Sequence, residues 1–225
     1  MNAGREEIER YVNVKRELHN LLLQFIENSS DEESNFTKLT DFIETRNYKE
    51  NYEELKHFLH LIISLFNNYH RNFNFSKKIE KILHFLVPCI KQTFSNQELF
   101  YFFKESKPIL LYFFENNIIE LDESIINKII QINDGNENRY CHFFYPQIKP
   151  FITEKQIKEI EIELFEYNQN VLNNFEEKQK AGENESYICS LIRNDSIDDF
   201  ISHINQFNIS LLSEIQPSIF ETNAF

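Results

Sequence analysis

The chain repeats part of its own pattern, and this repeat constrains the fold more than any single motif. The segment FLVPCIK at 85–91 recurs as FFYPQIK at 143–149, an offset of 58 residues. Three further pairs match in the same order: 61–66 with 109–114, 79–83 with 126–130, and 95–98 with 153–156. The offset grows from about 47 to 58 residues, which indicates an 11-residue insertion within 131–142. Degenerate repeats with insertions in loops are typical of α-solenoids, which usually serve as binding surfaces.

Residues that make turns are scarce in this sequence. Only 3 Gly and 5 Pro occur among 225 residues, which is too few for the turns of a many-stranded sheet. Hydrophobic residues make up 41% of the chain and aromatic residues 15%, enough for a packed core. The sequence therefore predicts an all-α protein, built as an irregular, solenoid-like array of helical repeats.

Apolar residues spaced three and four apart predict the first helices, over 4–28, 36–46 and 51–68. The stripe of the first helix runs through Tyr11, Val14, Leu18, Leu21 and Phe25. Ser76 is expected to cap the next helix. Pro88 should bend or end that helix, because proline removes an intrahelical donor and crowds the preceding turn.

Two segments fit the capping box, in which Ser or Thr is followed three residues later by Glu or Gln. They are Ser95–Glu98 and Thr153–Gln156, at matching places in the two repeat copies. Each should satisfy unpaired amides at a helix start, a contribution of about 1 kcal/mol. Further helices are predicted over 107–115, over 122–131 and from 153 to about 180.

The clearest domain boundary lies at the fully polar stretch 176–180. We therefore expect a helical-repeat region over 1–180 and a separate segment over 181–225. The elements predicted within that segment are a helix over 186–193, a turn at Asn194-Asp195 and a second helix capped by Ser196. Two tightly joined helices of about two turns match one ankyrin helix pair in scale. The array is thus predicted to end in a short ankyrin-like helix pair.

Several segments resemble one family. Three C-terminal motifs resemble the segment that leads into the ankyrin array of parabasalid ankyrin-repeat proteins: ICSLIRNDS at 188–196, DDFI at 198–201 and PSIFETN at 217–223. Proteins of that family carry a domain of unknown function that overlaps the ankyrin repeats. LLYFFEN at 110–116 and FYPQIK at 144–149 resemble the helical region before that array. The resemblance covers most of the chain and carries no catalytic or ligand residues.

This chain departs from that family in one respect. The ankyrin consensus Thr-Pro-Leu-His-x-Ala occurs nowhere in the sequence, and no tandem array fits after Arg193. In relatives the chain would continue beyond the position of Phe225 into recognisable repeats. The resemblance therefore implies that 181–225 is an ankyrin lead-in, and truncation is the expected reason that it stops; the alternatives are a fragment or a diverged member.

The charge balance argues against nucleic acid and anionic membranes as partners. The net charge is −13 and the isoelectric point is about 5.0, whereas phosphate binding requires clustered Lys and Arg. The nearest approach to a basic cluster is Lys77, Lys78 and Lys81, beside Glu80. We interpret these lysines as a solvated helix face.

The sequence predicts a soluble, cytoplasmic protein. No stretch approaches the ~18–20 apolar residues that a membrane span requires, and the charged N-terminus lacks the apolar core of a signal peptide. Cys89, Cys141 and Cys189 are too few and too widely spaced for a disulfide framework or zinc pairs. We expect them to be reduced and mostly buried.

Histidines on two predicted helices are the best candidates for a metal site. His57 and His60 lie three residues apart, and His84 lies on the next helix of the same repeat. Such imidazoles bind zinc or iron when carboxylates join them, but the sequence contains no His-Glu-x-x-His motif. We expect polar-edge positions beside apolar neighbours and no metal.

Two further constellations resemble catalytic groups. Cys141-His142 contains a nucleophile beside a base, but catalysis needs a geometry that the fold must supply. We expect partly buried loop residues there. The carboxylate groups Asp198-Asp199 and 31–33 occur at predicted helix starts, where negative charge favours the helix dipole. No Gly-rich phosphate loop or Gly-x-Ser-x-Gly motif occurs. The sequence therefore predicts no catalytic, cofactor-binding or metal-binding residues, and no enzyme.

Aromatic residues gather at 100–103, 112–114 and 143–145. Consecutive aromatics on a helix cannot all face outward, so most should lie in the core. One or two tyrosines are expected to line a groove, where amphipathic rings make good anchors.

The leading hypothesis is a non-catalytic, intracellular module that binds another protein along a repeat face. The acidic balance predicts a partner with a basic or mixed surface and moderate salt dependence. The alternative is a structural N-terminal cap of a longer ankyrin array, in which the apolar end 215–225 needs a missing surface. A remote alternative is an enzyme with an unrecognised site around His57, His60, His84 or Cys141. The sequence names neither the partner nor the oligomeric state.

Overall fold

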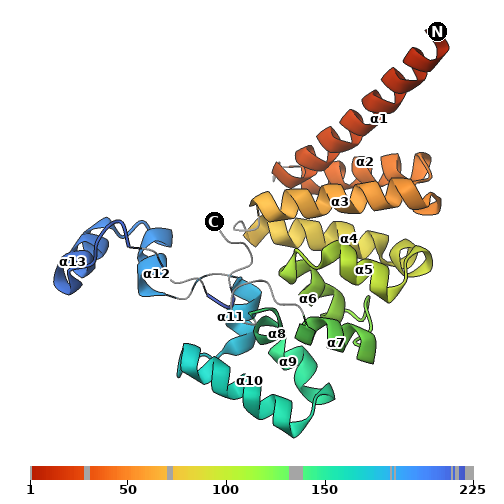
Figure 1. Ribbon diagram of the computed structural model, residues 1–225. Helices are drawn as coiled ribbons and strands as arrows, with labels where there is room; N and C mark the ends of the chain where they lie inside the picture. Colours follow the sequence, from red (N-terminus) through yellow and green to blue (C-terminus); the bar gives the residue numbers. More distant parts are fainter. Residues whose placement is uncertain are drawn as a thin grey trace. The chain divides into compact units, whose positions relative to one another are not determined.

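The chain is all-helical, as predicted. The computed structural model describes residues 2–27, 31–69, 73–131, 139–182, 184, 186–213, 215 and 218–220, and no strand occurs within these ranges (Figure 1). The α-helices are α1 (Asn2–Glu27), α2 (Glu32–Thr45), α3 (Tyr52–Tyr69), α4 (Phe73–Thr93), α5 (Asn96–Phe103), α6 (Lys107–Glu115), α7 (Glu123–Gln131), α8 (Arg139–Phe143), α9 (Tyr145–Ile148), α10 (Glu154–Tyr167), α11 (Phe175–Ala181), α12 (Tyr187–Arg193) and α13 (Ile197–Phe207). Two 3₁₀ helices accompany them, η1 (Tyr48–Glu50) and η2 (Lys149–Phe151).

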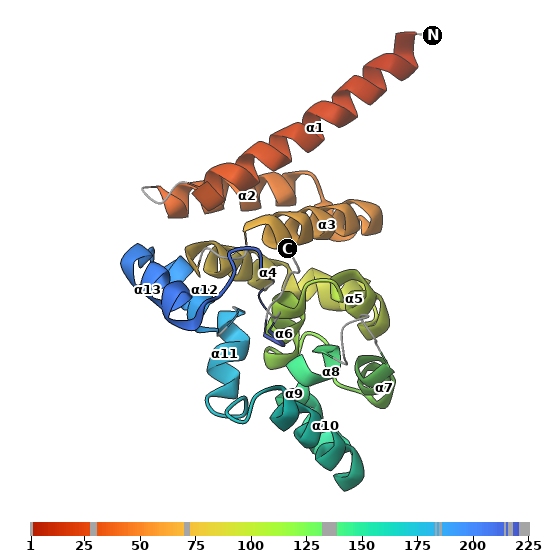
Figure 2. The same cartoon turned by 60° about the vertical axis from the view of Figure 1, so that its left-hand side comes forward.

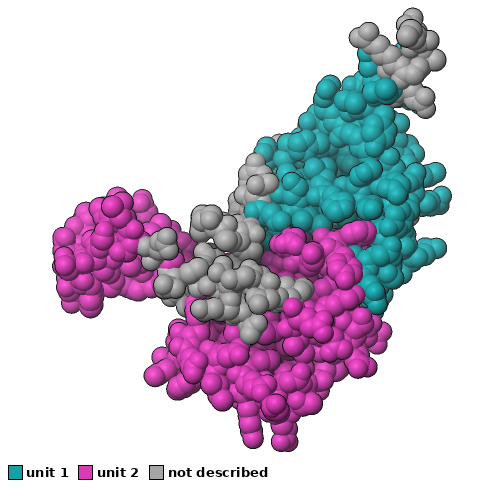
Figure 3. Space-filling model, viewed as in Figure 1, with its two compact units in different colours: residues 1–98 teal, residues 99–225 magenta. Residues whose placement is uncertain are grey.

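The chain packs into two compact units, Met1–Glu98 and Leu99–Phe225 (Figure 3). The division between them falls within α5. The domain boundary predicted at 180/181 lies at the end of α11, inside the second unit, and stays a prediction.

In the first unit α1 packs on α2 and α4, and α3 packs on α4. Figures 1 and 2 both show α2, α3 and α4 lying side by side. Helix α1 matches the predicted first helix, but only the C-terminal part of its apolar stripe is buried. Leu18 and Phe25 of that stripe are at most 2% exposed, whereas Tyr11 is 48% exposed. Leu21 is only partly buried, and its neighbour Leu22 takes the core position instead. The N-terminal half of α1 therefore carries apolar side chains that its neighbours do not cover.

The basic side chains of α4 join helices rather than forming a solvated face. Lys78 is buried, and its ammonium group donates to the carbonyl oxygens of Phe25 at 3.0 Å and Ile26 at 2.9 Å. It thereby caps the C-terminal end of α1, where carbonyl groups lack helical partners. Lys81 is half-buried, with Nζ 2.5 Å from a carboxylate oxygen of Glu33 in the first turn of α2. The solvated-face interpretation holds for exposed Lys77 and is wrong for Lys78 and Lys81.

Helix α4 differs from the predicted helix at its start and near its end. It begins at Phe73, so Ser76 lies inside the first turn and is not its N-cap. It continues through Pro88 to Thr93, so the proline does not end it. Pro88 and His84 both lie on the exposed side, where the carbonyl that loses its N–H partner can bond water.

The matching segments occur in the same order in the two repeat copies, but they form different numbers of helices. The segment that forms one helix in the first copy, α4, corresponds to three shorter helices in the second, α7, α8 and α9. Most of the predicted insertion, 132–138, lies outside the described residues. Pro146, the counterpart of Pro88, occupies the first turn of α9, where its missing N–H has no helical role.

Buried aromatic rings hold the second unit together, as predicted. Phe103 and Phe113 meet edge to face with their ring centroids 4.7 Å apart, and Phe143 and Phe144 do so at 4.8 Å. These four rings are fully buried, whereas Tyr101 in the same aromatic run is 54% exposed. Edge-to-face pairs add about 0.5–1.5 kcal/mol each to the free energy of area burial.

Both capping boxes are confirmed. The backbone N–H of Ser95 donates to a Glu98 carboxylate oxygen at 2.9 Å, and that of Glu98 donates back to Ser95 Oγ at 3.3 Å. Thr153 and Gln156 make the same reciprocal pair at 3.0 and 3.3 Å. The predicted helices at 107–115 and 122–131 correspond to α6 and α7.

The long helix predicted from 153 to about 180 is interrupted. Helix α10 ends at Tyr167 and α11 begins at Phe175. Between them the Asn168 side chain accepts from the backbone N–H of Asn170 at 2.9 Å, which competes with a helical bond. Asn174 adopts the left-handed conformation, with φ of 53°. The break places Val171, 1% exposed, in the core.

The C-terminal helix pair is present as α12 and α13, which pack against each other. Ser186 caps α12 by accepting from the backbone N–H of Cys189 at 3.3 Å. Ser196 occupies the N-cap position of α13 but makes no capping hydrogen bond, and α13 has 11 residues rather than two turns. Downstream, Phe220 is buried against Phe175 with ring centroids 4.9 Å apart. The described part of the predicted apolar end is therefore already partly packed, and 221–225 lie outside the described residues.

Candidate protein-binding groove

A groove runs along the middle of α1 on the side of α3. Its volume is about 550 Å³, and we call it the α1–α3 groove. The lining residues are Tyr11, Val12, Lys15, Arg16, Leu18 and His19 from α1, and His57, Phe58 and Leu61 from α3.

The groove lies where the middle of α1 passes alongside α3, and its lining comes from 11–19 and 57–61. Farther toward its N-terminus α1 extends past α2, as Figures 1 and 2 show. The floor contains buried Leu18 and Phe58, and one wall presents Tyr11 and Val12, which are 48% and 44% exposed. A partner's apolar side chain can pack against such a floor and wall and be buried there.

The charged residues lining the groove are all basic. Lys15, Arg16, His19 and His57 contribute to it and no carboxylate does, although the chain as a whole has a net charge of −13. Lys15 is ion-paired with Glu54, so Arg16 is the main cationic group that the groove offers to a partner. Because local charges influence which partner docks in one place, Arg16 matters more for the groove than the overall charge.

Lys15 is held in place by three neighbours. Its ammonium group is ion-paired with Glu54 on α3 and lies 5.2 Å from the ring centroid of Tyr11 and 5.3 Å from that of Tyr48. Burial, followed by the charge of Glu54, raises the pKa of Tyr48 well above its usual range. The phenol thus stays protonated beneath Lys15. This arrangement ties α1 to α3 beside the groove.

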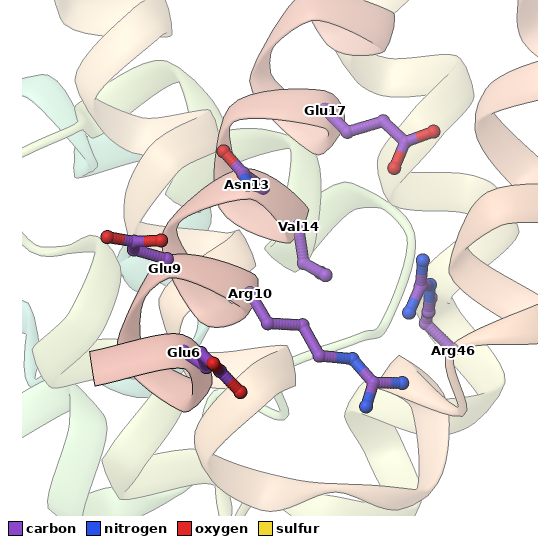
Figure 4. A pocket seen from close by; sticks show the side chains of 7 residues that line it. All are labelled: Glu6, Glu9, Arg10, Asn13, Val14, Glu17 and Arg46. Carbon is purple, nitrogen blue, oxygen red and sulfur yellow. The ribbon is translucent and has the colours of Figure 1, made fainter. Parts of the chain in front are cut away.

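A second hollow, of about 440 Å³, lies on another side of α1 (Figure 4). Its lining residues are Glu6, Glu9, Arg10, Asn13, Val14, Glu17 and Arg46. Figure 4 shows Arg10 reaching from α1 toward Arg46, with Val14 as the apolar side chain of the hollow. Its mixed charges and lack of an apolar floor make it a weaker candidate than the α1–α3 groove.

The α12–α13 pair exposes a second apolar surface. Ile192, Ile197, Ile201 and Phe207 are 50 to 61% exposed, and no residue of α13 is buried. Leu212, just beyond α13, is 93% exposed. We call this surface, formed by Tyr187, Ile192, Ile197, Ile201, Phe207, Leu211 and Leu212, the α12–α13 face.

The three histidines considered for metal binding lie on exposed helix positions. His57 lines the α1–α3 groove, while His60 and His84 lie outside it. Burial, and then the charges of Lys56 and His57, lower the pKa of His60. Within the described ranges no group of three or more His, Cys, Asp or Glu could hold a metal ion. The predicted absence of a metal site stays a prediction.

Cys141 and His142 belong to a helix rather than a loop. Both are 5% exposed in α8, so the interpretation as partly buried loop residues is wrong. His142 Nε2 lies 2.8 Å from a Glu163 carboxylate oxygen on α10. This pair ties α8 to α10. Cys89, Cys141 and Cys189 form no disulfide among the described residues, and of the three only Cys141 is buried.

The acidic groups lie at helix starts, as predicted. Asp198 and Asp199 occupy the first turn of α13, and Glu32 and Glu33 the first turn of α2. Asp31 takes the N-cap position of α2 without a capping hydrogen bond.

The groove was not predicted from the sequence. His57 was considered as a metal ligand, and Tyr11 was expected to pack on neighbouring helices. The available signal was the spacing of Lys15, Arg16 and His19 beside the apolar stripe of the first helix. That signal gained meaning only when α3 brought His57 and Phe58 alongside.

Comparison with known proteins provides no homologue. No family model, curated protein or solved structure matches this chain. The resemblance to parabasalid ankyrin-repeat proteins therefore stays a prediction. In the part of the chain that the structure describes, no helix is long and apolar enough to cross a membrane.

Proposed function

We propose that this protein is a non-catalytic interaction module whose α1–α3 groove binds a segment of a partner protein. The observation that carries the proposal is the pairing of an open apolar surface with a lining whose charged residues are all basic. Tyr11 and Val12 are about half exposed above a floor of buried Leu18 and Phe58. Amphipathic helices bind such grooves through apolar side chains spaced three and four residues apart.

The groove favours a partner segment that carries carboxylates. Arg16 is exposed, and its guanidinium donates to Asn13 at 3.5 Å, a weak contact that leaves other donors for a ligand. The overall charge of −13 favours basic or mixed surfaces for contacts elsewhere on the protein. The two expectations apply to different parts of the surface.

Two designed peptides with one apolar face test the proposal. One has Glu on its polar face and the other has Lys, and binding is measured by fluorescence anisotropy. We expect the acidic peptide to bind more tightly, with binding that weakens as salt increases. Val12→Asp should weaken binding about tenfold or more, because it places a carboxylate on the apolar wall. Equal binding of both peptides, or binding unaffected by Val12→Asp, would refute the proposal.

Ile162→Asp provides the matched control. Ile162 is 58% exposed on α10 and does not line the groove. This variant makes the same chemical change on another exposed helix surface, so it should bind the acidic peptide as the unmodified chain does. Circular dichroism of both variants verifies that helix content is retained.

A second candidate function is a structural cap of an ankyrin array. It is supported by the α12–α13 face, because stacked repeats cover such a surface with the next helix pair. To test it, consensus ankyrin repeats are fused after Phe225 and hydrogen exchange is measured. Slower exchange in α13 of the fusion than in the unextended chain would support capping, and unchanged exchange would count against it.

We also propose a cytoplasmic location. The support is that Cys89, Cys141 and Cys189 form no disulfide among the described residues, which fits a reducing compartment. Imaging of a fluorescent fusion in the source cell tests this directly. A signal confined to a secretory compartment would overturn it.

A further inference from the structure

Helix α13 has the properties of a ligand for the α1–α3 groove. At about 100° per residue, its five apolar side chains fall within an arc of roughly 120°. They are Ile197, Phe200, Ile201, Ile204 and Phe207. None of them is buried, although α12 packs beside the helix. The helix is thus strongly amphipathic, and its apolar side is still largely open.

The charges of α13 are opposite to those of the groove. Asp198 and Asp199 lie exposed in its first turn, and the helix contains no Lys or Arg. Its one basic group, His203, lies within 4.9 Å of the Tyr187 ring centroid and 4.7 Å of the Phe207 ring centroid. Helix α13 therefore carries an apolar side and, outside that side, two carboxylates in its first turn, which are opposite in charge to Arg16 of the groove.

The dimensions of the two surfaces also agree. At 1.5 Å per residue, the 11 residues of α13 extend roughly 16 Å. The α1 side of the groove, from Tyr11 to His19, extends roughly 12 Å. The helix is thus somewhat longer than the groove and can span it from end to end.

We infer that α13 of one copy of this chain docks in the α1–α3 groove of a second copy. This inference rests on the proposed function, since it assumes that the groove receives an amphipathic helix. Each copy then contributes one donor surface and one acceptor surface. Such a contact is heterologous, so repeated docking builds rings or open chains rather than a two-fold dimer.

Sedimentation velocity over a range of protein concentrations provides the first measurement. We expect the sedimentation coefficient of the unmodified chain to rise with concentration. Ile201→Asp changes the docking helix and Val12→Asp changes the groove, and each variant alone should stay monomeric. Ile162→Asp should associate like the unmodified chain. A chain that is monomeric at every concentration, as it would be if α13 docked in its own groove, overturns the inference.

Mixing the two monomeric variants is the decisive experiment. A Val12→Asp copy retains an intact α13, and an Ile201→Asp copy retains an intact groove. Their mixture should therefore form a one-to-one dimer that cannot grow further. If the mixture stays monomeric, or if only Ile201→Asp blocks association, α13 does not dock in the groove.

Charge reversal tests the electrostatic part of the contact. Arg16→Glu should weaken association in the unmodified background. Pairing an Arg16→Glu groove with a copy carrying Asp198→Lys and Asp199→Lys should restore at least part of it. Unchanged association of both altered copies with unmodified partners would contradict the assigned contact.

The peptide experiment separates this inference from the proposed function. If the acidic peptide binds at Val12 and the chain nevertheless stays monomeric, the groove binds helices but α13 is not its ligand. If the peptide competes with association, both statements are supported. If neither peptide binding nor association occurs, both fail.

Discussion

The ammonium nitrogen of Lys78 lies 3.0 Å from the carbonyl oxygen of Phe25, 53 positions earlier in the chain. A second bond, at 2.9 Å, reaches the carbonyl of Ile26. Lys78 is 5% exposed, so a cation from α4 satisfies the C-terminal end of α1 inside the first unit. Positive charge is favourable at that end because the helix dipole is negative there.

Lys78→Met should destabilise the protein by about 2–4 kcal/mol, because two carbonyl groups lose a charged donor while the apolar stem is retained. The measurement is the free energy of unfolding in urea. Lys77→Met is the matched control: Lys77 is exposed beside it on the same helix and should change stability by less than about 0.5 kcal/mol. Equal effects of the two substitutions would contradict the capping role.

Gln179 should hold the second unit together through its amide. It is 1% exposed, and its Nε2 donates to the Phe143 carbonyl at 2.6 Å and to Gln147 Oε1 at 2.8 Å. We expect Gln179→Leu to cost about 1–3 kcal/mol, because buried acceptors on α8 and α9 lose their donor. Thermal unfolding measures the loss. Gln169→Leu, an exposed glutamine in the preceding turn, should have little effect.

Acid should weaken the contact between α9–η2 and α10. Hydrogen bonds from Lys149 and then Tyr145 hold the pKa of Glu161 below its usual value of 4.5. A carboxyl with a lowered folded pKa adds stability above its unfolded pKa and loses it as pH falls through the folded pKa. Stability should therefore fall below about pH 4.5, and Glu161→Gln should reduce that fall.

Urea unfolding at several pH values measures this dependence. The effect is expected to be small, since Lys149 and Glu161 are partly exposed and solvent screens them. Glu159→Gln, which alters an exposed pair on the same helix, should leave the acid dependence nearly unchanged. An acid dependence that is identical in the unmodified chain and Glu161→Gln would exclude this pair as its source.

Asparagine replaces glycine at the left-handed positions of this chain. Among the described residues, the non-glycine positions with positive φ are Asn47, Asn117, Asn174, Asp195 and Asn208. Asn117→Gly should leave stability unchanged or raise it, whereas Asn117→Val should cost about 1–2 kcal/mol because a β-branched side chain clashes there. Asn127→Val is the control: it introduces valine at an exposed position in α7, and so measures how much valine lowers stability where the backbone is not left-handed. Urea unfolding of the three variants decides between these effects.

The local elements were predictable because each depends on neighbours in sequence. Ser95 and Thr153 reach amides three residues away, and the apolar stripe of α6 is formed within 107–115. The break after Tyr167 was missed because the 3,4 spacing continues through Val171. The competing hydrogen bond of Asn168 was present in the sequence, but periodicity alone assigns it no weight.

An all-α chain, the two capping boxes and an aromatic core were predictable from the sequence, since these follow from spacing, local hydrogen bonding and burial of apolar rings. The tertiary structure decided which lysine is buried, because Lys78 meets Phe25 only when α4 packs on α1. It also decided the candidate site. Helix α3 places Phe58 beside Leu18, and α12 leaves Ile201 half exposed. Contacts between segments far apart in sequence depend on packing, and no local pattern encodes them.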